Sequence, residues 1–102
     1  MKPVVFHPDA KAEMLAAGDY YDACCPGLGR EFTDRVEDAL ARMSERPQSF
    51  AVHESSGSRK CVVDRFPYRI FFIERREDMW VVAVAHASRR PDYWNDRLDA
   101  SP

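Results

Sequence analysis

Apolar side chains recur every three or four residues along the first half of the chain, which predicts two helices. The first runs from Pro8 to about Cys24, with apolar positions at Ala10, Met14, Ala17 and Tyr21. The second covers about residues 28–44, with apolar positions at Leu28, Phe32, Val36, Ala39, Leu40 and Met43. Pro26-Gly27 separates the two. Because the connection is so short, the helices should pack as an antiparallel hairpin.

The second half of the chain alternates between strand-like runs and turns. Residues 59–65, 68–75 and 79–87 are the three longer runs, and residues 4–7 form a shorter one before the first helix. The polar stretch 48–58 lacks periodicity and is predicted to be a loop. Residues 80–85 are apolar on both faces, which is typical of a central strand covered by helices.

These elements predict an α+β fold with the order β-α-α-β-β-β. The three C-terminal strands should form an antiparallel meander, and the first strand should join an edge of that sheet. The helical hairpin should pack on one face. A chain of 102 residues is expected to form one domain.

The sequence contains no sign of a membrane span, a signal peptide, a metal site or a cofactor site. No apolar stretch approaches the roughly 20 residues that a membrane span needs, and the N-terminus does not resemble a signal peptide, so we expect a cytoplasmic protein without a membrane partner. The three cysteines include a vicinal pair but no CxxC spacing, so no metal or cofactor is predicted.

Charge is divided unevenly along the chain. Residues 1–58 carry 6 basic and 10 acidic side chains, a balance of −4, whereas residues 59–102 carry 9 and 7, a balance of +2. The segment 84–94, which covers the end of the last strand and the residues after it, contains arginine and aromatic residues close together. An arginine-rich face of this kind suits phosphates or an acidic protein segment.

The chain resembles the RelE/ParE toxins of bacterial type II toxin–antitoxin systems. The resemblance covers about residues 3–97 and rests on the order and spacing of several segments. These are residues 6–10, Tyr20-Tyr21, Phe32, Pro47, the strand that begins at Arg59, residues 66–70 and residues 84–94. It implies the RelE/ParE-like fold, which agrees with the element order predicted above.

The resemblance implies one of two activities. RelE-like members are ribosome-dependent endoribonucleases that cut messenger RNA, whereas ParE-like members inhibit DNA gyrase without being hydrolases. RelE-like toxins use several Lys/Arg side chains and a C-terminal Tyr, but here Ser88 stands where a basic residue is expected and Trp94 stands where the Tyr is expected. An indole N–H cannot act as a base. We therefore predict a ParE-like gyrase inhibitor, with a RelE-like endoribonuclease as the alternative.

Each activity predicts its own site residues. A gyrase inhibitor would bind its target through Arg65, Arg69, Arg89, Arg90, Tyr93 and Trp94. A ribonuclease would use Arg69, His86, Arg90 and Tyr93 as catalytic residues. Two alternatives remain open at this point. The strand arginines could instead dock an antitoxin, and Tyr93-Trp94 could fold back over the sheet.

The resemblance also implies a cognate antitoxin, whose C-terminal segment would wrap the toxin in a hetero-oligomer. The candidate antitoxin-binding residues are Met14, Tyr21, Met43 and Arg59. The first three are equally consistent with positions in the core of the toxin.

Overall fold

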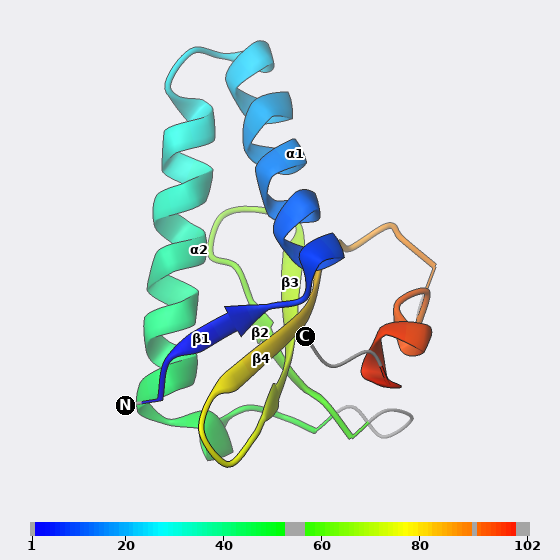
Figure 1. Cartoon of the computed structure of the whole chain (residues 1–102). Helices are drawn as coiled ribbons and strands as arrows, with labels where there is room; N and C mark the ends of the chain where they lie inside the picture. The colour runs from blue at the N-terminus through cyan, green and yellow to red at the C-terminus, as the bar shows by residue number, and fades with distance from the viewer. Residues whose placement is uncertain (1, 53–56, 91, 100–102) are drawn as a thin grey trace.

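The computed structural model describes residues 2–52, 57–90 and 92–99, and these contain two α-helices and four β-strands (Figure 1). The helices are α1, Pro8–Cys24, and α2, Leu28–Glu45. The strands are β1, Val4–Phe6, β2, Arg59–Val62, β3, Tyr68–Glu74, and β4, Met79–His86. Short 3₁₀ turns cover Pro47–Ser49 and Asn95–Asp99. The predicted α+β order β-α-α-β-β-β is confirmed, and residues 53–56 of the predicted loop lie outside the described residues.

Local chemistry fixes the ends of the two helices. At the start of α1, Pro8 needs no N–H partner, and the backbone N–H of Asp9 donates to His7 Nδ1 at 3.0 Å. At the hairpin tip, Gly27 has a φ of 91°, which favours glycine, and its N–H donates to the Asp22 carboxylate at 3.1 Å. The N–H of Gly29 donates to the same oxygen at 3.0 Å. One side chain of α1 therefore caps the start of α2.

The sheet has the strand order β1-β4-β3-β2. Strands β2, β3 and β4 form the predicted antiparallel meander, and β1 lies at the predicted edge. Strand β1 is parallel to β4, however, so the sheet is mixed rather than wholly antiparallel. The helical hairpin carries the chain away from the sheet after β1, and a parallel pair requires a long connection of this kind.

Both faces of the sheet are covered. The hairpin buries one face in a core that includes Phe32, Val36, Met43, Ile70 and Val81. On the other face, a smaller cluster of buried residues contains Phe71, Trp80, Val82, Ala83, Ala85 and Trp94. Trp94 belongs to the segment after β4, so the C-terminal part of the chain itself covers this face. Figure 1 shows this segment beside the sheet.

The register changes between Phe71 and Phe72 of β3. Phe71 is opposite Ala83 and Phe72 is opposite Val81, so Val82 has no partner on β3. Such a bulge bends the strand and leaves local backbone groups to be satisfied by other means.

Neither described helix has the length and apolar character that crossing a membrane requires.

Candidate functional site

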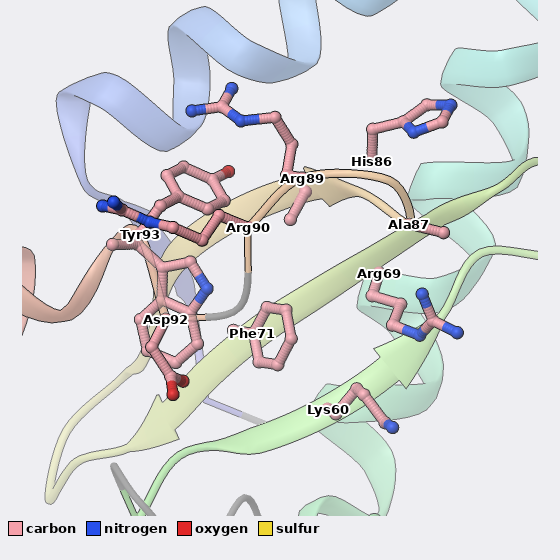
Figure 2. Close-up of a pocket in the computed structure, with 11 residues that line it drawn as sticks. Lys60, Arg69, Phe71, His86, Ala87, Arg89, Arg90, Asp92 and Tyr93 are labelled. Atoms are coloured by element: carbon pink, nitrogen blue, oxygen red, sulfur yellow. The ribbon is translucent and has the colours of Figure 1, made fainter.

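A hollow lies where β4 ends and the C-terminal segment returns over the sheet (Figure 2). Its volume is about 230 Å³. It is lined by Lys60, Arg69, Phe71, Ala85, His86, Ala87, Arg89, Arg90, Asp92, Tyr93 and Trp94. Strands β2, β3 and β4 supply the floor, and the segment after β4 supplies the wall.

Strand register explains which side chains share this face. Lys60 on β2 is opposite Phe71 on β3, and Arg69 on β3 is opposite Ala85 on β4. Residues 69 and 71 lie two apart on one strand, so their side chains project to the same face. This is the face away from the helical hairpin, and Figure 2 shows Arg69 and Lys60 on adjacent strands there.

Four cationic side chains line the hollow, at Lys60, Arg69, Arg89 and Arg90, against the single carboxylate of Asp92. Within the described part of the chain, none of the four forms an ion pair, whereas Arg35, Arg75 and Arg97 elsewhere all do. Cations that converge without a partner of opposite charge repel one another and attract an anionic group. The hollow is therefore suited to a negatively charged ligand or protein surface.

The imidazole of His86 does not join Arg69. Along β4 the facing pairs are Arg69 with Ala85 and Tyr68 with His86, so alternation puts Arg69 and His86 on opposite faces. The His86 ring lies edge-on to Tyr68, 5.1 Å between centroids, and its Nδ1 accepts from the Ser88 backbone N–H at 2.9 Å. Figure 2 shows the ring directed away from Arg69 and Lys60. The structure does not gather the predicted catalytic set.

Tyr93 lines the hollow with its ring while its hydroxyl points to α1. The hydroxyl donates to Glu13 at 2.5 Å, and the Arg89 guanidinium lies 3.9 Å from the ring centroid. Burial, and then the bond to the Glu13 carboxylate, raise the pKa of Tyr93 far above its ordinary value. The phenol is therefore protonated at neutral pH and its proton is already engaged.

Trp94 corrects one expectation from the sequence. Its side chain is only 1% exposed, and its ring packs against Phe71 with centroids 4.6 Å apart. The sequence left two alternatives for Tyr93-Trp94, contact with a target or folding back over the sheet. Trp94 folds back over the sheet. Its apolar ring is buried against the sheet because that face would otherwise be open to water.

Arg65 is exposed but lies apart from the hollow. It occupies the turn between β2 and β3 with a φ of 70°, and its guanidinium is 3.8 Å from Glu31 on α2. We therefore leave Arg65 out of the site. Of the predicted target-binding residues, the site retains Arg69, Arg89, Arg90 and Tyr93.

The predicted antitoxin-binding residues are dispersed. Met43 is fully buried in the helix-facing core, so it cannot contact a partner in this conformation. Met14 and Tyr21 are half-buried against that core, and Arg59 donates to the Phe50 carbonyl at 2.7 Å. Of the two positions that its helical spacing allows, a groove position and a core position, Met43 occupies the core position.

Three residues of this region were missed by the sequence reasoning. Lys60 could have been found, since it alternates with buried Cys61 on a strand beside Arg69. Glu13 and Arg97 carried no sequence signal, because their side chains meet only after folding, at 2.9 Å from Arg97 Nη1 to Glu13 Oε1.

Comparisons with known proteins bear on the family and the fold. The family model described as ParE toxin of type II toxin-antitoxin system, parDE, matches residues 4–91. A solved structure described as a chromosomal ParDE TA system from P. aeruginosa matches with a TM-score of 0.73 and 16% sequence identity, over 84% of this chain and 96% of that chain. At that identity the likeness concerns the fold. No curated protein gives a sequence match.

Proposed function

Because this chain belongs to the ParE toxin family of type II toxin–antitoxin systems, we propose that it inhibits DNA gyrase and is neutralised by a cognate antitoxin. The observation that carries the proposal is the hollow, whose four cationic side chains form no ion pair within the part of the chain that the structure describes. Lys60, Arg69, Arg89 and Arg90 form the surface that would engage the target, and Tyr93 holds Arg89 in place by stacking. Inhibition would proceed by binding, without a hydrolytic step.

Two features of the hollow support inhibition by binding over messenger RNA cleavage. Cleavage through the 2′-hydroxyl needs a base and an acid beside the cations. His86 faces the opposite side of the sheet from Arg69, and the Tyr93 hydroxyl is bound to Glu13 with a raised pKa. The cations remain available, but the described groups beside them are poorly placed to transfer protons.

We propose that the antitoxin binds along the helical hairpin. A shallow groove there is lined by Met14, Leu15, Gly18, Asp19, Asp22, Gly27, Gly29, Arg30 and Thr33. Leu15, which lines this groove, is 55% exposed, and Tyr20 on the same helix is 64% exposed, so both leave apolar surface open to a partner. An amphipathic segment of the antitoxin could cover them. Met14 is the one predicted antitoxin contact that lines this groove.

The test of the target is a supercoiling assay with purified gyrase and relaxed plasmid, run beside a ribosome-bound messenger cleavage assay. Wild-type toxin should block supercoiling and leave the messenger intact. Arg69→Glu should weaken inhibition at least tenfold, because it places a negative charge among the cations of the hollow. Arg30→Glu is the matched control, since Arg30 is an exposed residue of α2 outside the hollow.

Two results would overturn the proposal. Cut messenger with normal supercoiling would mean that the toxin is a ribonuclease. Equal loss of inhibition in Arg69→Glu and Arg30→Glu would mean that the hollow is not the surface that meets gyrase.

A further inference from the structure

Strand β1 leaves part of β4 without a neighbouring strand on its outer side. The parallel pairing ends with Phe6 opposite Val81, and the last backbone bond runs from the His7 N–H to the Val81 carbonyl at 2.8 Å. The chain then turns into α1. The polar backbone groups of β4 that follow are buried, and buried groups of this kind need partners.

Two side chains far apart in the sequence supply those partners. The Val84 N–H donates to Glu13 Oε1 at 3.1 Å, and Arg97 Nη1 donates to the Val82 carbonyl at 3.0 Å. Glu13 belongs to α1, whereas Arg97 belongs to the C-terminal segment. Both bind β4 at the bulge, where the register change has displaced the backbone from regular pairing.

The carboxylate of Glu13 joins these parts. It accepts from Arg97 Nη1 at 2.9 Å and from Arg97 Nη2 at 3.1 Å, which is a bidentate pair. It also accepts from the Tyr93 hydroxyl at 2.5 Å. The side chains of Glu13 and Arg97 are 16% and 14% exposed. The shielded carboxylate of Glu13 on α1 thus accepts from strand β4 and from the C-terminal segment. Glu13, Tyr93 and Arg97 therefore form a fixed joint rather than a surface ion pair.

Tyr93 connects Glu13 and Arg97 to the hollow, because its ring contacts Arg89. The phenol ring has the Arg89 guanidinium 3.9 Å from its centroid and the Arg97 guanidinium 5.3 Å from it. Arg89 is one of the cations that line the hollow, and Trp94, next to Tyr93, is buried against Phe71 in its wall. A change at Glu13 is therefore transmitted to Arg89 and to the wall of the hollow.

We propose that Glu13 is the positioning residue of the toxin's target-binding surface. It holds Tyr93 and Arg97, and through them fixes the C-terminal segment on the sheet and Arg89 at the rim of the hollow. Tyr93 thereby acts as a positioning residue and not as an acid, a base or a free stacking platform. The part that concerns the target rests on the proposed function, whereas the joint itself does not.

The first test needs no target. The chain has two tryptophans, Trp80 and Trp94, and both are buried. Glu13→Gln keeps the side chain's shape but removes the charge and one acceptor. We expect a red-shifted emission, about twofold stronger quenching by acrylamide and faster amide exchange in residues 92–99, with unchanged far-ultraviolet circular dichroism. Glu37→Gln, the same substitution at an exposed position of α2, should change none of these.

The second test measures gyrase inhibition by the same proteins. Glu13→Gln should raise the toxin concentration needed for half-inhibition about tenfold, and Glu37→Gln should leave it unchanged. Tyr93→Phe keeps the ring over Arg89 and loses only the hydroxyl, so it should weaken inhibition less than Glu13→Gln. A general role in stability would not produce this order once all variants are confirmed to be folded.

The outcomes separate the two proposals. If acrylamide quenches the tryptophans of Glu13→Gln no more than those of wild type, the joint is refuted. A mobile segment with undiminished inhibition would refute positioning of the target surface and leave gyrase inhibition standing. If wild type itself does not inhibit gyrase, the proposed function fails while the fluorescence result still decides the joint. Should Glu13→Gln not fold, Arg97→Lys, which cannot form the bidentate pair, replaces it in both tests.

Discussion

Replacing Trp94 with alanine tests whether the C-terminal segment is part of the folded core. If Trp94 served only to contact a target, the substitution would leave the folded protein as stable as before. The structure predicts a different result, because the indole is 1% exposed and packs on Phe71 at 4.6 Å between centroids. Trp94→Ala should therefore destabilise the protein as a core substitution does.

The magnitude follows from the burial. Truncation of a large buried aromatic side chain costs about 3–5 kcal/mol. We expect the lower end, about 3 kcal/mol, because Trp94 packs on one face of the sheet in the smaller of the two clusters. A domain of this size has a total stability of roughly 5–15 kcal/mol, so the loss is a large share of it. At about 4 °C or more for each kcal/mol, the melting temperature should fall by more than 10 °C.

Urea unfolding followed by circular dichroism measures the change directly, since the midpoint should fall while the slope stays constant. Tyr20→Ala is the control, because Tyr20 is an aromatic residue that is 64% exposed and should change stability by less than about 0.5 kcal/mol. A Trp94→Ala protein within about 0.5 kcal/mol of wild type would refute the packing described for this segment. The prediction for Trp94 as a target-binding residue would then regain its basis.

Three further substitutions test the fold. Met43→Ala should cost about 2–5 kcal/mol in thermal melts because Met43 is fully buried, and a loss below 1 kcal/mol would place it in a groove instead. Gly29→Ala should destabilise by about 1–3 kcal/mol in urea, since its Cβ would lie 2.4 Å from the Gly18 carbonyl oxygen; an unchanged midpoint would contradict this close helix approach. The Arg75 guanidinium lowers the pKa of Asp78, so this pair should stabilise the protein above the ordinary Asp pKa of about 3.9 and lose its effect as the pH falls through the lowered value. Asp78→Asn should flatten that part of the acid unfolding curve, and an identical curve would show that the pair does not contribute.

The helices illustrate how far local sequence patterns reach. The predicted start of α1 at Pro8 and end at Cys24 are confirmed, and α2 ends at Glu45, one residue beyond the prediction. These limits were predictable because proline, glycine and apolar spacing act within a few residues along the chain. The parallel pairing of β1 was not predicted, because strand direction depends on where the hairpin returns the chain.

The candidate site shows the opposite case. The sequence alone placed a concentration of arginine after β4 and identified Arg69, Arg89 and Arg90, which do line one hollow. It could not decide which aromatic side chains stay accessible, and Trp94 is buried while Tyr93 lines the hollow. Charge and residue type are properties of the chain, but burial depends on which apolar face a segment finds.

The sequence by itself determined the element order, the α+β class and the presence of arginine and aromatic residues in the segment after β4, since hydrophobic period and composition are local properties. Only the tertiary structure decided that Glu13, Tyr93 and Arg97 meet, because their contacts span 80 and 84 residues. It also decided that His86 and Arg69 face opposite sides of the sheet, through the register of β3 with β4. Register and long-range contacts result from the packing of whole elements, and so no window of the sequence contains them.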